Sequence, residues 1–96
     1  DTIELDVSNK YVIIKSLYIY GDFEKAHNLV QLPNRQDSFE YWLLSWELAL
    51  QCENHTLDSY CRKHIWAYFP NKIKENLPKI NLMLNMLAPS RGAELV

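Results

Sequence analysis

The fold is decided by residues 37–51, which read DSFEYWLLSWELALQ. Asp37 followed by Glu40 has the form of a capping box, which begins a helix by satisfying its free backbone amides. Large apolar side chains then recur three and four residues apart, the spacing of one face of an α-helix. The pattern predicts a helix that begins at Asp37 and buries one face, made of Phe39, Trp42, Leu43, Trp46, Ala49 and Leu50.

Two further helices are predicted after residue 51. Thr56 can cap the first of them, and Pro70 ends it because the proline ring clashes with the preceding turn. The short connection to the helix before it favours an antiparallel hairpin. Pro78 suits the first turn of the last helix, which residues 89–92 close. The predicted buried faces are Leu57, Cys61, Ile65 and Tyr68 in the one helix and Ile80, Met83, Leu84 and Leu87 in the other.

Before residue 37 the sequence predicts one short strand and two helices. Residues 3–7 alternate between apolar and acidic side chains, the period of a half-buried strand. Residues 9–20 predict a helix that Gly21 stops, with a strand as the alternative. Asp22 can cap a shorter helix that ends before Pro33. The predicted buried residues are Ile13, Ile14, Leu17 and Tyr20 in the first helix and Phe23, Ala26 and Val30 in the second.

Length and composition bound the fold class. The chain has 96 residues, enough for one domain, and a second domain does not fit. Apolar residues make up 48% and charged residues 23%, with two Gly and four Pro, which is typical of an ordinary globular protein. We therefore expect residues 1–96 to form a single, mainly α domain of four to five amphipathic helices packed as antiparallel pairs, with room for one short N-terminal strand.

Charge and hydropathy exclude two classes of partner. Ten basic and twelve acidic residues give a formal charge of −2, and no segment collects the lysines and arginines that bind phosphate, so we expect no nucleic-acid partner. No apolar run approaches the roughly eighteen residues of a membrane span, and residues 1–6 lack the character of a signal peptide. We expect no membrane association.

Cys52 and Cys61 fall within helical patterns, which indicates free thiols in a reducing compartment, either cytoplasm or nucleus.

Cysteine and histidine form the sharpest local pattern, because Cys52, His55, Cys61 and His64 are two copies of a ligand pair with two residues between its members. All four side chains are ligands of zinc. Five residues between the pairs leave little room for the usual loop, however, and the second pair falls on a predicted continuous helix. We expect no metal site, and a small zinc-binding interaction domain stays an alternative.

Catalytic chemistry has no recognisable basis in the chain. A cysteine and histidine pair needs an orienting third group and an oxyanion site, commonly built from glycine-rich backbone, and the chain has only two glycines. No phosphate-binding loop, dinucleotide fingerprint or metalloprotease motif is present. We therefore predict that the protein is not an enzyme and uses no cofactor.

Aromatic side chains are the candidates for partner binding. Three Trp, six Tyr and three Phe are many for this length. Trp42 and Trp46 share the predicted buried helix face, whereas Tyr41 and Trp66 fall outside the apolar stripes. We predict that Tyr41 and Trp66 are exposed and contact another protein, with packing against other parts of a larger protein as the alternative.

The order of these features resembles the end of a BTB/POZ fold followed by a BACK domain. Residues 37–96 resemble the BACK helices, and residues 1–36 resemble the late strand, helix and tyrosine-glycine turn of BTB. The early BTB strands and the dimer helix are missing, and residues 22–36 have no counterpart. The matching positions are Ile3 to Ser8, Tyr18 to Gly21, Trp46, Leu48, Ala49, Leu57, Cys61, His64, Ile65, Phe69, Leu82, Leu84, Leu87 and Glu94 to Val96.

This resemblance implies a substrate adaptor of a cullin-type ubiquitin ligase. Such proteins form homodimers through BTB parts that are missing here and grip a cullin scaffold through BTB and the first BACK helices. A second interpretation comes from residues 21–26, GDFEKA, which resemble the helix-pair repeats of tetratricopeptide and coat-like scaffolds. A right-handed spiral of helices with no strand at residues 3–7 would favour this α-solenoid interpretation.

Overall fold

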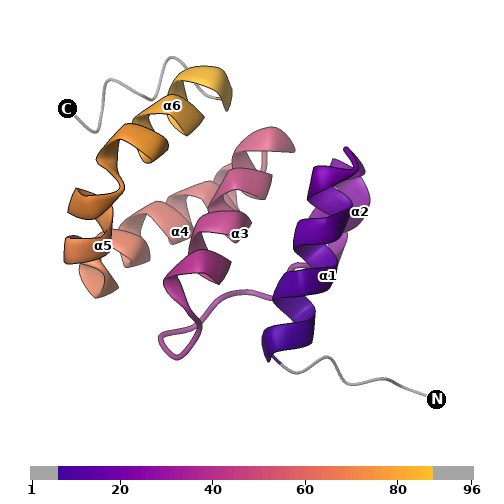
Figure 1. The fold of residues 1–96 in the computed structure, drawn as a ribbon, viewed down its shortest axis with the longest axis horizontal. Coiled ribbons are helices and arrows are strands. Elements are labelled where there is room, and N and C mark those ends of the chain that lie inside the picture. Colours follow the sequence, from indigo (N-terminus) through magenta and orange to yellow (C-terminus); the bar gives the residue numbers. More distant parts are fainter. Residues whose placement is uncertain (1–6, 88–96) are drawn as a thin grey trace.

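A computed structural model describes residues 7–87, and these residues form six α-helices. The helices are α1 (Val7–Ile19), α2 (Phe23–Leu29), α3 (Phe39–Gln51), α4 (His55–Tyr68), α5 (Pro70–Glu75) and α6 (Leu77–Leu87), drawn in Figure 1. The predicted mainly α fold is confirmed, with six helices where four to five were expected. No strand occurs within residues 7–87. The predicted strand lies outside the described residues except for Val7, which begins α1.

Helix α3 is the centre of the molecule, and ten of its thirteen residues are buried. The six side chains of its predicted apolar face are all buried, and they pack with α4, α5 and α6 in one core cluster. Tyr41, Leu44 and Leu48 of the same helix belong to a second cluster, formed with Ile14 of α1 and Ala26 of α2. Because α3 packs into both clusters, apolar side chains cover more of its circumference than in a helix with one buried face.

Side-chain caps begin α3 and α4, one or two residues away from the predicted positions. The Ser38 hydroxyl accepts a hydrogen bond from the amide of Tyr41 at 3.2 Å, so Ser38 caps α3 where Asp37 was expected. The Asn54 side chain accepts from the amide of Leu57 at 3.1 Å and caps α4 in place of Thr56. Neighbouring residues at both sites have oxygen-bearing side chains of similar capping strength, so the sequence alone does not separate them.

The α1–α2 connection follows the prediction, but the buried face of α1 does not. Gly21 has φ +85, and its amide and that of the next residue bond back to the carbonyls of Tyr18 and Leu17 at 3.0 and 2.9 Å. This hydrogen-bond pattern ends helices and favours glycine. Ile14 is buried and Leu17 is half-buried, whereas Ile13 and Tyr20, also predicted to be buried, are exposed. Helix α1 is apolar on several sides, and α2 and α3 cover only one of them.

Pro70 both ends α4, as predicted, and begins α5, which was not predicted. Proline fits the first turn of a helix because its missing amide has no partner there in any case. Helix α5 buries Ile73 and leads the chain to α6, whose buried residues Ile80, Met83 and Leu84 confirm most of its predicted stripe. Tyr68, predicted to be buried, is exposed at the end of α4. The closing segment 89–92 lies outside the described residues.

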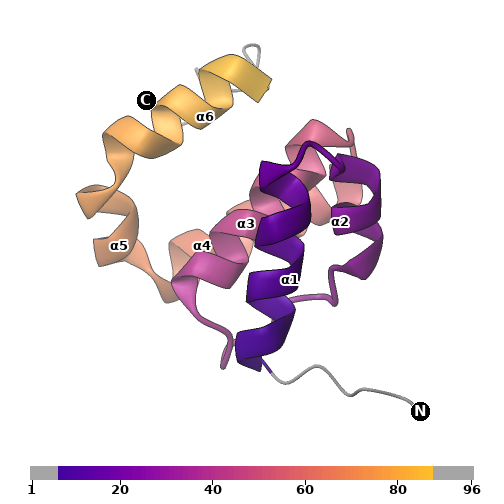
Figure 2. The same ribbon diagram turned by 45° about the vertical axis from the view of Figure 1, so that its right-hand side comes forward.

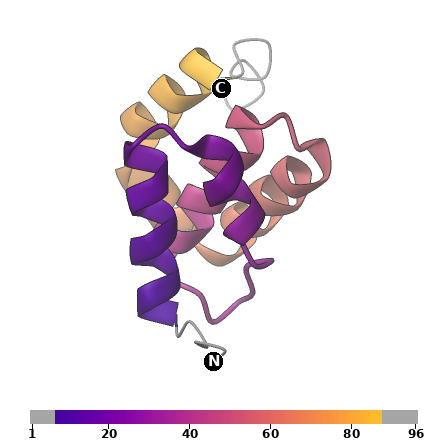
Figure 3. The ribbon, with the colours of Figure 1, turned by 90° about the vertical axis from the view of Figure 1, so that its right-hand side faces the viewer.

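The helices pack as successive neighbours around α3. Helices α1 and α2 form a hairpin, seen side by side in Figure 3, and α3 and α4 make the most extensive contact. Helices α5 and α6 turn back so that α6 also contacts α3. Figures 1 and 2 show α1 and α6 on opposite sides of α3. One side of α3 therefore lies between α1 and α6.

Candidate binding surface

Tyr41, one of the two predicted partner-binding residues, is fully buried, so the expectation of an exposed side chain is wrong. Its hydroxyl donates to the carbonyl of Gln31 at 2.7 Å and accepts from the amide of Gln31 at 3.0 Å. The ammonium group of Lys10 lies 4.3 Å from the ring centroid. Burial raises the pKa of Tyr41, against the opposing effect of the backbone hydrogen bond. Tyr41 therefore holds the segment after α2 onto the second face of α3.

Trp66, the other predicted partner-binding residue, lies exposed on α4. The exposed fraction of its side chain is 37%, equal to that of Tyr68 two residues later. The predicted exposure is confirmed, and partner binding stays a prediction. Tryptophan is enriched among the residues that contribute most to binding at protein interfaces.

The four cysteine and histidine residues do not come together. Cys61 is buried in the core of α3 and α4, and burial raises the pKa of its thiol to about 12. Cys52 ends α3, where its thiol lies 3.7 Å from the carbonyl of Phe23. His55 is exposed at the start of α4, and His64 stacks on Tyr60 with ring centroids 4.3 Å apart. Within residues 7–87, no three His, Cys, Asp or Glu side chains are placed to hold a metal ion.

His64 instead belongs to an aromatic stack that fastens the loop before α3. Trp42 and Tyr60 lie on the ring of His64, with centroids 5.9 and 4.3 Å away. The indole of Trp42 donates to the carbonyl of Asn34 at 2.9 Å, and the hydroxyl of Tyr60 donates to the carbonyl of Pro33 at 2.8 Å. Trp42 and Tyr60 therefore have a structural role in holding this loop.

One hollow lies at the end of α2 and the start of α4. Its volume is about 430 Å³, and His27 and Asn54 meet across it, with ring nitrogen and amide nitrogen 3.1 Å apart. Leu32, with 63% of its side chain exposed, stands at its edge. The remaining lining residues are Val30, Thr56, Leu57 and Tyr60.

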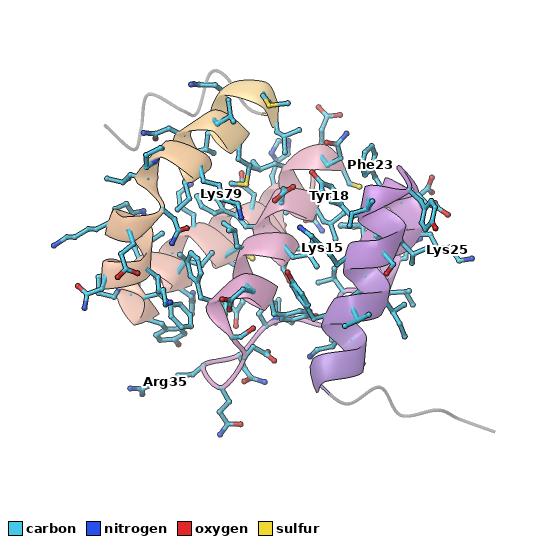
Figure 4. All side chains as sticks on the ribbon, in the orientation of Figure 1. Lys15, Tyr18, Phe23, Lys25, Arg35 and Lys79 are labelled. Carbon is cyan, nitrogen blue, oxygen red and sulfur yellow. The ribbon has the colours of Figure 1, made fainter. Side chains whose placement is uncertain are left out.

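A second hollowed region lies on α3 between α1 and α6, and we call it the α1/α6 groove. It consists of two hollows of about 200 and 40 Å³ that share Glu47 and Lys79. Figure 4 shows Lys15 and Tyr18 on the α1 side and Lys79 on the α6 side of this groove. Its other lining residues are Tyr11 of α1, Glu40, Leu43 and Leu44 of α3, and Leu82, Met83, Met86 and Leu87 of α6.

The polar groups of the α1/α6 groove are only partly paired. The hydroxyl of Tyr18 hydrogen-bonds to Glu47, and the pKa of Tyr18 is raised, mainly by burial and then by this carboxylate. Within residues 7–87 the ion pairs join Lys10 to Asp37 and Arg62 to Asp58, so neither Lys15 nor Lys79 has an ion pair there. The groove thus combines an apolar α6 wall with two cations at its sides.

Exposed apolar side chains border the same groove. Leu82 and Met86 on the α6 wall are 61% and 71% exposed. Val12, Ile19 and Tyr20, which are 57%, 71% and 88% exposed, do not line the groove. Sequence reasoning missed all of these as candidate site residues. The signal that could have found Leu82 and Met86 is their position outside the predicted buried stripe of their helix.

The chain finds no match among protein-family models, curated proteins or solved structures. Within residues 7–87, no helix combines the length and apolar character that crossing a membrane requires.

Proposed function

We propose that this chain is a protein-protein interaction module that catalyses no reaction of its own. The observation that carries the proposal is the exposure of Leu82 and Met86, 61% and 71%, next to each other on the α6 wall of the α1/α6 groove. Contiguous apolar surface costs free energy in water, and its usual explanation in a folded domain is a binding partner. The exposed Trp66 on α4 adds a second candidate contact.

In finer terms, we propose a substrate adaptor of a cullin-type ubiquitin ligase, acting in the cytoplasm or nucleus. The support is the BTB and BACK resemblance. Four of its positions, Trp46, Leu57, Cys61 and Ile65, are buried in the core cluster that α3 and α4 share. The spacing of these four positions is therefore the spacing of residues that pack α3 against α4.

Binding of the purified chain to a purified cullin scaffold tests this proposal. We expect the two proteins to co-elute, and we expect Trp66→Ala to weaken the complex if α4 takes part. Lys63→Ala is the matched control, because Lys63 is exposed on the same helix. A chain that keeps its helical circular dichroism and its cooperative melting, yet does not bind the cullin, would contradict the adaptor proposal.

A second candidate function is a segment of an α-solenoid scaffold. The observation that favours it is the run of contacts between successive helices, from α1 with α2 to α5 with α6, in a molecule 47 Å long and 21 Å thick. Solenoids grow by stacking each helix pair on the one before it. Small-angle scattering of the chain tests this candidate, since a solenoid segment stacks with further copies into a rod as the concentration rises, whereas a compact domain keeps its radius of gyration near 13.1 Å.

A further inference from the structure

We propose that the α1/α6 groove binds an amphipathic α-helix of a partner protein, one with Leu-sized or Met-sized side chains on one face and a carboxylate beside them. The inference rests on the proposed interaction function and adds to it a surface and the chemistry of the ligand. It requires no particular identity of the partner.

The construction of the groove favours a helix over an extended peptide. Its floor is α3, and its walls are α1 and α6, so the described residues offer no sheet edge there. An extended peptide in an apolar groove would leave its backbone amides and carbonyls without partners, which costs free energy. A helix satisfies those groups within itself and presents side chains every third or fourth residue.

The α6 wall determines the apolar side of the ligand. Both methionines of the chain, Met83 and Met86, lie on it, next to Leu82 and Leu87. Methionine is flexible and polarizable, and surfaces rich in it adapt to apolar helix faces. Leu82 and Met86 are exposed in the free protein, so a helix laid against them removes apolar area from water.

The two lysines determine the charge of the ligand. Lys15 and Lys79 stand on opposite sides of the groove, each without an ion pair among residues 7–87 (Figure 4). The ammonium group of Lys15 lies 5.8 Å from the centroid of the Tyr18 ring, a contact that leaves its charge unneutralised. The carboxylates of the floor have other stabilising groups. Glu47 accepts from Tyr18, and Glu40 lies in the first turn of α3, where the helix dipole favours a negative charge. A carboxylate on the bound helix therefore fits between the lysines better than a cation does.

A displayed library of amphipathic helical peptides of roughly four turns, with randomised charges beside a fixed apolar face, tests the proposal. Peptides are selected on the full chain, and their affinities are measured by fluorescence anisotropy. We expect Asp and Glu to be enriched over Lys and Arg at the randomised positions. We expect Met86→Asp, and separately Lys15→Glu with Lys79→Glu, to weaken binding about tenfold or more.

Matched controls separate the groove from the rest of the surface. Leu32→Asp changes a side chain as exposed as Leu82 but outside the groove, and Lys25→Glu reverses a charge on α2 on the far side of α1 in Figure 4. Both should leave the affinity unchanged. Peptides with lysine in place of the selected acids should recover binding to the doubly reversed variant. Circular dichroism verifies that each variant is folded.

Several outcomes would overturn the proposal. One is a selection with no acidic bias; another is binding that the groove variants and the controls weaken equally. Wild-type dimers that Met86→Asp converts to monomers would assign the groove to a second copy of the chain. Displacement of the probe by a synthetic peptide of residues 88–96 would assign it to the chain itself. Failure of cullin binding leaves the groove proposal standing, and loss of groove binding leaves a cullin contact elsewhere open to its own test.

Discussion

At the scale of single residues, two charged side chains brought into the core hold segments together. Lys10 and Asp37 form an ion pair of 3.5 Å, and their side chains are 8% and 3% exposed. Asp37 also accepts from the amide of Asn34 at 2.9 Å, and Lys10 lies over the ring of Tyr41. These contacts connect α1 to the loop before α3, a connection between residues far apart in the chain.

Replacing Asp37 with Ala should destabilise the fold by about 3 kcal/mol, because the ammonium group of Lys10 would stay buried without its partner. The free energy of unfolding in urea measures the loss. Glu40→Gln is the control, since Glu40 is exposed three residues later, and its effect should stay within about 0.5 kcal/mol. A loss for Asp37→Ala no larger than that of the control would show that the ion pair does not contribute.

The buried thiol of Cys61 should make the folded protein less stable at high pH. Its pKa is raised by burial from 9.0 to about 12 in the folded protein. The unfolded thiol loses its proton at lower pH than the folded one, so deprotonation stabilises the unfolded state as the pH rises. The contribution is fully present below about pH 9 and is lost as the pH approaches about 12.

Urea unfolding of the wild type and of Cys61→Ala, in buffers from pH 8 to pH 11, measures the contribution of Cys61. Tyr18, Tyr41 and Tyr60 also have raised pKa values and act in the same direction in both proteins. The difference between the two proteins therefore reports Cys61. We expect the wild type to lose stability more steeply with pH, and parallel curves would contradict the assignment.

At the scale of elements, α1 and α3 end in the same way with different residues. After α1, Gly21 takes the left-handed conformation with φ +85, and after α3, Glu53 takes it with φ 55. At both ends the following amide bonds back to a carbonyl five residues earlier, Asp22 to Leu17 at 2.9 Å and Asn54 to Ala49 at 2.8 Å. Glycine adopts this conformation without steric cost, and glutamate does not.

Two substitutions at these helix ends should therefore change stability in opposite directions. Gly21→Ala should destabilise by about 1 kcal/mol through the backbone alone, because a Cβ there meets nothing within 4 Å. Glu53→Gly should stabilise by roughly 0.5 to 1 kcal/mol by removing the same strain. Thermal and urea unfolding measure both. Changes of the same sign would show that contacts, and not the left-handed backbone, decide these positions.

At the scale of the whole molecule, α3 joins two apolar clusters into one folding unit. Leu48 belongs to the cluster with α1 and α2, and Ile65 belongs to the cluster with α4, α5 and α6. Because the side chains of α3 enter both, we expect the two clusters to unfold together.

Leu48→Ala and Ile65→Ala should each cost about 2 to 5 kcal/mol, the range for truncation of a buried aliphatic side chain. Each should lower the stability of all six helices together, as a single transition by circular dichroism and by the fluorescence of the tryptophans. Hydrogen exchange that protects α4 while α1 opens in the Leu48→Ala variant would show two separate units.

The sequence by itself determined five of the six helices, the ends marked by Gly21 and Pro70, and the buried face of α3, because periodicity, glycine and proline act within a few residues of the chain. Only the tertiary structure decided which sides of those helices are covered. Tyr41 is buried because α3 has α1 and α2 behind it as well as α4 in front, and Leu82 and Met86 are exposed because α6 reaches α3 with one face only. Burial depends on neighbours distant in sequence, and local spacing carries no information about them.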